Sequence, residues 1–558
     1  MPAEPFNLLT AAWLPVRRRS GRLDLIRPAQ ITESLDDDPV LETAWPRPDF
    51  RIATIEFLIG LLATFAPSAD EDAWEGWWQD APGPEVLEAA FRPYAHAFAL
   101  DGDGPRFLQD FDTLDGDPNP AGTLLIEAPG ANTLRNNADL LVKRGRVNVL
   151  SRAAAAMALF TLQTYAPSGG AGHRVGLRGG GPLTTLILPR SNDGAPAPLW
   201  RTLWAHVRPS KPVSLAALPH VLPWLARTPT SEKNRTAIGA GLLPGHVFWS
   251  MPRRIRLVFE ANPAGRPCDL TGVLDRVTVI GWQTRPYGLF YQDWSPPHPL
   301  SPRYRQKKTD PWLPVHGQPA GIGYRDWVGV VVSADDGTRE PAEAVTWFRR
   351  NCPRADRPAG IRLLAAGYDM DNMKARGFVE SEMPLPPPLD NSRAEALDDR
   401  IRRLVRAAGI TDSLLRGAVR AALFSPGTKI DAAGASLLLA VRERFWRDAE
   451  SAFYARLRAV VAEIEADPDP PIEPLTRPWL KDLRSTALAG FDAAAPLDPD
   501  QYRERGGDRP EQPVVRARGF LSAAFNGFGS GGRELFIMLG LSVPEPAQPG
   551  RKKARSGA

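Results

Sequence analysis

The chain changes character at a proline-rich stretch, residues 381–390, which reads SEMPLPPPLD. Proline cannot continue a helix and stiffens the backbone, so this stretch predicts a boundary between two regions. Four long amphipathic segments follow it, at 393–424, 430–466, 474–493 and 511–526. Their apolar residues recur at helical spacing and Pro, Gly and Asp separate them, so the sequence predicts a helical bundle.

The region before the boundary mixes short apolar runs with Pro, Gly and Asp. We expect strands at 184–188, 254–259, 277–282 and 327–332. We expect helices at 52–65, 85–98 and 151–165. The predicted fold class is therefore α+β, with a large mixed α/β N-terminal domain followed by a C-terminal four-helix bundle. The expected boundaries are 1–384 for the first domain, 385–545 for the bundle, and 546–558 for a disordered basic tail.

Composition places the chain among ordinary globular proteins, because 43% of its 558 residues are hydrophobic and 24% are charged. Its two cysteines, Cys268 and Cys352, are too few for a disulfide framework and favour a reducing compartment. The apolar run 52–65 is interrupted by Glu56 and is shorter than the roughly 20 residues that span a bilayer. The N-terminus lacks the basic-then-apolar order of a signal peptide. We therefore expect a soluble, cytoplasmic protein.

The sequence contains no recognisable catalytic motif. Its seven histidines are scattered, no pair has the i, i+4 spacing of a helical metal site, and neither CxxC nor GxSxG occurs. Adjacent acids such as Asp398 and Asp399 point in different directions and resemble solvated charges. We therefore expect no enzyme activity, no metal and no cofactor.

The most unusual segment is 167–185, PSGGAGHRVGLRGGGPLTT, which has seven glycines from Gly169 to Gly181. A Walker A loop needs a Lys-Ser/Thr pair after its last glycine, where Pro182 stands here. A dinucleotide fingerprint follows a strand and opens a helix, whereas this segment follows a predicted helix and leads into a predicted strand. The spacing fits either a tight structural turn or a loop that lets a ligand approach the backbone closely.

Local charge favours the ligand loop. Residues 130–190 contain eight Lys and Arg against one acid, and 282–308 contain five against one. Such basic stretches, in a chain whose net charge is only +4, are typical of a surface that binds a polyanion.

Three groups of residues resemble the CasA family, the large subunit of the type I-E CRISPR Cascade surveillance complex. The opening residues 6–9 and 13–17, FNLL and WLPVR, resemble the start of that family. The segment 169–185 resembles its glycine loop and the strand after it. The residues AGY at 366–368 and DNM at 371–373 resemble the approach to its wedge hairpin.

The resemblance implies a DNA-binding function rather than an enzyme. Such a subunit inspects double-stranded DNA for a short protospacer-adjacent motif (PAM), helps to open the duplex, and leaves sequence reading to the guide RNA. The implied partners are the backbone, small and crRNA-processing subunits of Cascade, the crRNA 5′ handle, double-stranded target DNA and a helicase-nuclease.

The implied glycine loop consists of Ser168, Gly169, Gly170, Ala171 and Gly172, with Arg174 and Arg178 following it. The implied basic reader is Arg285, and the implied wedge is Asp371, Asn372 and Met373 with Lys374 beside it. Contacts to the crRNA end are implied for Asn136, Asn137, Lys143, Arg144 and Arg146.

The same residues also fit other assignments of the PAM-reading position, of the wedge and of the function. Thr284 and Pro286 compete with Arg285 for the reader position, and the wedge segment also fits an exposed turn. A lone Cys268 cannot hold the structural zinc suggested by cysteine clusters in some family members. Two rival classes are a nucleotide hydrolase or transferase with a glycine-rich phosphate loop, and a scaffold subunit that binds RNA or a protein without reading a PAM.

Overall fold

The computed structural model describes residues 5–139, 144–170, 172–191, 193–232, 242–292, 294, 296–352, 358, 360–497, 503–504 and 510–545. Contacts between Cα atoms divide the chain into two units. Unit 1 comprises Met1–Gly323 and Gly329–Leu389, and unit 2 comprises Tyr324–Val328 and Asp390–Ala558. The predicted tail at 546–558 lies outside the described residues.

The core of unit 1 is built around α1 (Pro48–Phe65), the helix expected at 52–65. Pro48 occupies its first turn, where a missing N–H costs nothing, and nearly every residue after it is buried. Its Phe57 ring lies 5.7–6.4 Å, centroid to centroid, from the rings of five aromatic neighbours: Trp13, Phe98, Phe107, Phe160 and Trp249. A helix that is apolar on all sides therefore fills the centre of this unit.

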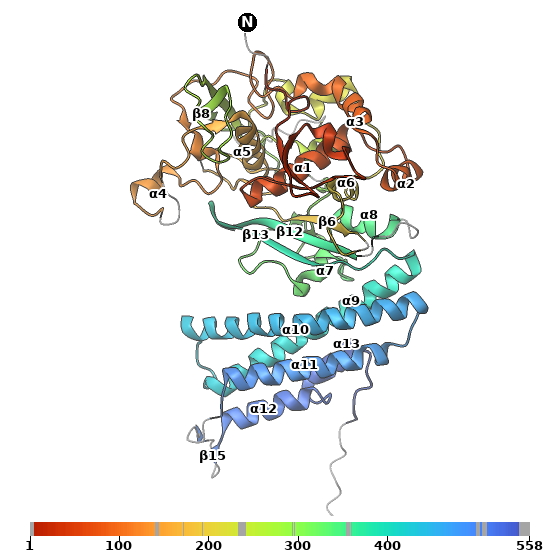
Figure 1. The fold of residues 1–558 in the computed structure, drawn as a ribbon. Coiled ribbons are helices and arrows are strands. Elements are labelled where there is room, and N and C mark those ends of the chain that lie inside the picture. Colours follow the sequence, from red (N-terminus) through yellow and green to blue (C-terminus); the bar gives the residue numbers. More distant parts are fainter. Residues whose placement is uncertain are drawn as a thin grey trace, which may run out of the picture. The chain divides into compact units, whose positions relative to one another are not determined.

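Unit 1 contains several antiparallel sheets (Figure 1). One has the order β2-β1-β3, with bounds Leu23–Ile26, Leu14–Arg18 and Val40–Thr43. A second has the order β13-β12-β6, with bounds Lys374–Pro384, Gly360–Asp371 and Thr184–Arg190. A third joins β4 (Asn119–Pro120), β5 (Leu150–Ser151) and β7 (Arg254–Ala261) to β8 (Val277–Arg285). A fourth has the order β10-β9-β11, with bounds Leu313–Pro314, Arg303–Tyr304 and Arg339–Glu340.

The expected helix at 151–165 is present as α5 (Arg152–Tyr165), and the Ser151 side chain caps it by accepting the Ala154 N–H. The expected helix at 85–98 changes type partway, because Pro93 has no N–H. It consists of α3 (Pro84–Phe91) followed by a 3₁₀ helix at Arg92–Ala97. The other helices in unit 1 are α2 (Glu71–Gln79), α4 (Ala131–Arg135), α6 (Leu199–Trp204) and α8 (Glu343–Asn351).

The expected strand at 327–332 is wrong. A 3₁₀ turn at Tyr324–Asp326 leads into the short helix α7 (Trp327–Val330). Gly329 has a φ of +111°, which an extended strand does not allow. Within unit 2, the rings of Tyr324 and Trp327 pack on Phe453, with centroids 4.5 and 5.2 Å away. Burial of these two aromatic side chains outweighs the strand preference of the valines beside them.

Unit 2 is a helical bundle, and with unit 1 it confirms the predicted α+β class. Its helices are α9 (Asn391–Leu423), α10 (Ala432–Ala466), α11 (Ile472–Ala494), α12 (Pro513–Ala524) and α13 (Gly529–Met538). Helix α9 contacts each of the other four. The four predicted segments are present, and α13 is an addition to them. A two-stranded pair, β14 (Arg503–Glu504) and β15 (Pro510–Glu511), precedes α12.

Candidate nucleic-acid interface

The first glycines of the 167–185 segment form a small closed turn. The Gly169 N–H donates to the His173 carbonyl at 3.1 Å, and the His173 N–H donates to the Gly170 carbonyl at 2.7 Å. Gly170 has a φ of +68°, and a Cβ built there would meet nothing within 4 Å. The turn therefore presents open space at Gly170, while Ala171 lies outside the described residues.

The turn is fixed against the end of β8. The Tyr287 N–H donates to the Gly172 carbonyl at 2.8 Å, and a Cβ on Gly172 would lie 2.7 Å from Cε1 of the Tyr287 ring. The Arg253 guanidinium donates to the carbonyls of Pro167 and Arg174, which holds both ends of the turn. Burial lowers the pKa of Arg253 to about 10, so this side chain stays charged at neutral pH.

Arg285 is the last residue of β8. It lies two residues before Tyr287, whose backbone is hydrogen-bonded to the glycine turn. Its side chain is 47% exposed, and its guanidinium is 3.7 Å from the carboxylate of Asp115, which is itself almost fully exposed. An exposed pair at that distance is weak, so Arg285 is available to an anionic ligand.

The two arginines that follow the turn are engaged inside the protein. The Arg174 guanidinium donates to the hydroxyl and the carbonyl of Ser231, both at 3.0 Å, and lies over the Phe290 ring. Arg178 is buried and forms an ion pair with Glu56 at 2.6 Å. Our expectation that Arg178 contacts nucleic acid is therefore corrected, because a buried, paired guanidinium supports the loop from within.

The predicted wedge residues form the tip of a long hairpin. Asp371 of β12 pairs with Lys374 of β13, so Asn372 and Met373 are a two-residue loop. Asn372 has a φ of 54°, a conformation that asparagine tolerates better than most residues. The Met373 side chain is 58% exposed. Below the tip, Arg376 forms a two-pronged ion pair with Asp369.

The hairpin meets the other end of the glycine-rich segment. Gly181 has a φ of +65°, and a Cβ there would lie 2.5 Å from the Tyr368 carbonyl oxygen and 2.7 Å from Met370 Cγ. Only glycine permits this approach. The glycine-rich segment therefore contacts the residues just after β8 at one end and β12 at the other.

The residues expected at the crRNA end follow α4 (Figure 1). The Arg144 guanidinium pairs with Asp139 and donates to the Asn137 side chain and the Leu134 carbonyl, both at 3.0 Å. Asn136 and Arg146 also belong to this segment, and both are exposed. These contacts are local, so they do not join the segment to the glycine turn. Lys143 lies outside the described residues.

Sequence reasoning missed the residues that hold this arrangement in place, such as Arg253, Tyr287 and Glu56. Their partners are far away in the sequence, so spacing does not reveal them. The sequence does carry a signal for Glu56, because it is the single acid in the apolar run 52–65 and a buried acid needs a partner.

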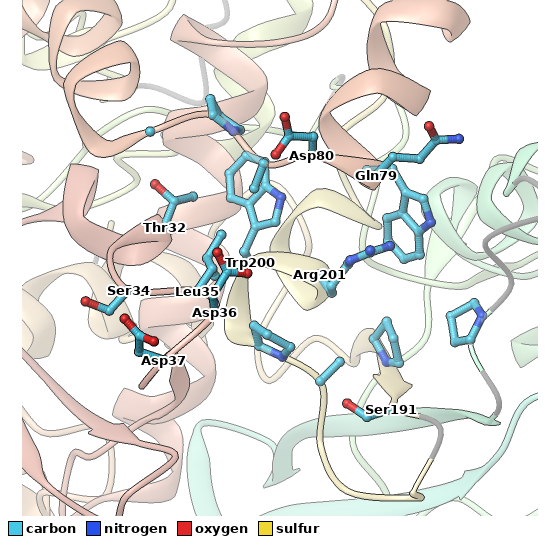
Figure 2. Close-up of a pocket in the computed structure, with 18 of the residues that line it drawn as sticks. Thr32, Ser34, Leu35, Asp36, Asp37, Gln79, Asp80, Ser191, Trp200 and Arg201 are labelled. Atoms are coloured by element: carbon cyan, nitrogen blue, oxygen red, sulfur yellow. The ribbon is translucent and has the colours of Figure 1, made fainter.

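The described residues include no group of three or more His, Cys, Asp and Glu side chains able to hold a metal ion. The helices of the described chain are also too short or too polar to cross a bilayer. A cavity of ≈ 630 Å³ lies away from the predicted site, and Figure 2 shows Asp36, Asp80 and Trp200 among the residues that line it. None of the predicted site residues lines this cavity.

Comparison with known proteins identifies the class. The family of the CRISPR-associated protein Cse1 matches residues 7–489. Solved structures share the fold at low identity. CasA from Thermus thermophilus has a TM-score of 0.62 and 17% identity, over 96% of this chain and 100% of that one. Cse1 from Thermobifida fusca has a TM-score of 0.64 and 18% identity, over 96% of this chain and 98% of that one. A chain described as part of a "CRISPR RNA-guided surveillance complex" has a TM-score of 0.64 and 16% identity, over 94% of this chain and 100% of that one.

The chain belongs to the Cse1 family, which is also called CasA. This confirms the resemblance drawn from the opening, glycine-rich and hairpin residues.

Proposed function

We propose that this chain is the large subunit of a type I-E Cascade complex, and that it recognises the PAM in double-stranded DNA and helps to open the duplex. Membership of the Cse1 family over residues 7–489 supports the assignment to Cascade. The fold shared with a chain of an RNA-guided surveillance complex supports it further.

One observation carries the PAM-reading part of the proposal. The glycine turn, the region of Arg285 and the hairpin are linked by direct contacts in unit 1. Gly172 is hydrogen-bonded to Tyr287, two residues beyond Arg285. Gly181 lies against Tyr368, three residues before the end of β12 at Asp371. The segment thus has a contact near each end, which supports a site composed of the turn, the cation and the hairpin tip.

Each element has a physical role in this proposal. The turn lets a phosphate or base edge approach the backbone at Gly170, where no side chain intervenes. Arg285 supplies a positive charge to the DNA. The exposed Met373 parts the first base pairs, as apolar side chains do when they unstack base steps. The guide RNA then reads the target sequence by base pairing.

The proposal assigns the remaining parts binding roles without catalysis. Asn136, Asn137, Arg144 and Arg146 face the crRNA 5′ handle or a backbone subunit. Unit 2 contacts the small subunits, the displaced strand and the helicase-nuclease that degrades the target. The nucleotide-enzyme alternative is disfavoured, because the glycine-rich segment runs from α5 into β6, the reverse of a phosphate-binding loop.

Substitution of Gly170 tests PAM reading against the scaffold alternative. Gly170→Asp places a carboxylate where phosphate must approach, whereas Gly194→Asp adds the same charge at another open glycine with positive φ. The assay is DNA binding by the complex reconstituted with crRNA and each variant, on targets with and without a PAM. We expect Gly170→Asp alone to lose the PAM-dependent part of binding while assembly survives. Equal binding by both variants and wild type would favour the scaffold alternative.

A further inference from the structure

Helix α1 carries two buried carboxylates that the proposed function does not use. Asp49 and Glu56 are each 2% exposed, and both lie in a helix that is otherwise almost entirely apolar. They are seven residues apart, so they project from one side of the helix about 10 Å apart along its axis. Buried charges are costly unless they are paired, so their partners indicate what they hold.

Glu56 binds both ends of the glycine-rich segment. One carboxylate oxygen accepts the Tyr165 hydroxyl at 2.5 Å and the Thr184 hydroxyl, and the other accepts the Arg178 guanidinium at 2.6 Å. Tyr165 is the last residue of α5, just before the segment, and Thr184 is the first residue of β6, near the end of the segment. Arg178 lies between them. One carboxylate thus closes the segment into a loop.

Asp49 binds the wedge strand. Its Oδ2 accepts the Tyr368 hydroxyl at 2.6 Å and the Arg47 guanidinium at 2.7 Å, and its Oδ1 accepts the Arg47 Nε–H at 3.0 Å. Arg47 also pairs with Glu127 at 2.6 Å, so this carboxylate is fixed within a network. Tyr368 is buried in β12, whose last residue, Asp371, begins the hairpin tip.

The two anchors touch each other. The rings of Tyr165 and Tyr368 lie 6.1 Å apart, centroid to centroid, and both pack on Phe378 of β13, at 6.4 and 4.9 Å. The two tyrosine hydroxyls donate to different carboxylates of α1, that of Tyr165 to Glu56 and that of Tyr368 to Asp49. The packed rings hold the two tyrosines beside each other, while each hydroxyl is bound to a different carboxylate of α1.

We propose that Asp49 and Glu56 are positioning residues, and that α1 sets the spacing between the glycine loop and the wedge through the hydroxyls of Tyr165 and Tyr368. The inference rests on the proposed function and deepens it. Glu56 fixes the loop that recognises the PAM, and Asp49 fixes the strand that carries the wedge. Neither carboxylate touches DNA.

Two variants that remove only a hydroxyl separate these roles. Tyr165→Phe removes one hydrogen bond to Glu56, and Tyr368→Phe removes the hydrogen bond to Asp49, while both rings keep their packing. Tyr94→Phe is the matched control, because it removes a buried hydroxyl that donates to the Val213 carbonyl at 2.6 Å and contacts neither carboxylate. Each variant is assembled into the complex with crRNA, and its melting temperature is measured.

Two affinity ratios are then measured: PAM over non-PAM targets, and fully paired over pre-opened targets that carry a PAM. We expect Tyr165→Phe to lower the first ratio about tenfold and Tyr368→Phe to lower the second about tenfold, as loss of one hydrogen bond to a charged group predicts. A purely structural role would lower the melting temperature and shift both ratios together. The proposal is overturned if both ratios stay at the wild-type value or move as they do in Tyr94→Phe.

Second variants cover the case in which a tyrosine variant fails to assemble. Thr184→Val, which removes another hydroxyl from Glu56, must reproduce the Tyr165→Phe result. Asp49→Ala, which removes the acceptor of the Tyr368 hydroxyl, must reproduce the Tyr368→Phe result. The proposed function is tested separately by Gly170→Asp. If that variant loses PAM dependence while the tyrosine variants match wild type, only the positioning role of α1 is wrong. If Gly170→Asp also matches wild type, the proposed function fails first.

Discussion

Two buried histidines make unit 1 sensitive to mild acid. His206 accepts the Ile187 N–H through Nε2 at 2.8 Å, while its Nδ1 lies 2.6 Å from the Thr202 carbonyl and must carry the proton. His246 lies between the Val221 carbonyl and the Tyr291 hydroxyl, at 2.9 and 2.8 Å. Burial lowers the pKa of each imidazole to about 4 from an ordinary 6.5.

The sign of the effect follows from proton uptake on unfolding. Between pH 6.5 and pH 4 these two histidines are protonated in the unfolded chain but stay neutral in the folded chain. The free energy of unfolding therefore falls as the pH drops from 6.5 towards 4. One pKa unit corresponds to about 1.4 kcal/mol, so each histidine costs about 2 kcal/mol at pH 5 relative to pH 7. The two together cost about 4 kcal/mol of unfolding free energy.

Urea unfolding at pH 7 and pH 5, followed by tryptophan fluorescence, measures this loss. His206→Gln removes one of the buried histidines, so we expect the difference between the two pH values to shrink by about 2 kcal/mol relative to wild type. His96→Gln, at an exposed histidine, is the control and should leave the difference unchanged. The reasoning is refuted if wild type and His206→Gln lose the same stability between the two pH values.

Three further predictions concern other parts of the chain. Arg285→Gln should weaken DNA binding and reduce the slope of log K against log salt by about 0.9, measured by titration at several salt concentrations; an unchanged slope would mean that Arg285 contacts no phosphate. Gly181→Ala places a Cβ 2.5 Å from a carbonyl oxygen of β12, so it should lower the unfolding free energy by about 1–3 kcal/mol, and a neutral result would contradict the close approach. A chain cut to 1–384 keeps Tyr324 and Trp327 but loses their partners in unit 2, so replacing both with Ser should raise its soluble yield. Equal yields would show that these rings do not limit solubility.

Local patterns predicted much of the fold. The bundle helices follow from long amphipathic periodicity. Helix α13 was missed because it begins Gly-Ser-Gly-Gly, a composition that disfavours helices, and tertiary packing on α9 overrides that preference. The strand expected at 327–332 failed because burial of Trp327 outweighs local propensity.

The candidate site likewise has features that the sequence reveals and features that it does not. Its glycines and hairpin tip stand out in the sequence because they need special backbone conformations. The sequence does not reveal that the Arg178 side chain is buried, because its partner Glu56 is 122 residues away. The bond between Tyr368 and Asp49 spans 319 residues and gives no local signal at all. Contacts of that range are set by the packed fold.

The hairpin tip provides the most direct test of the proposed function. Replacing Asn372 and Met373 together with glycine keeps the two-residue loop and removes both side chains. Leu274→Gly, at a side chain that is 67% exposed elsewhere in unit 1, controls for the loss of exposed apolar surface. Opening the first base pairs costs a few kcal/mol per step, and on our proposal the wedge supplies part of that energy. In the reconstituted complex, the double variant should bind fully paired PAM targets poorly and targets already unpaired beside the PAM nearly as well as wild type. Equal loss on both targets would contradict strand opening by this hairpin.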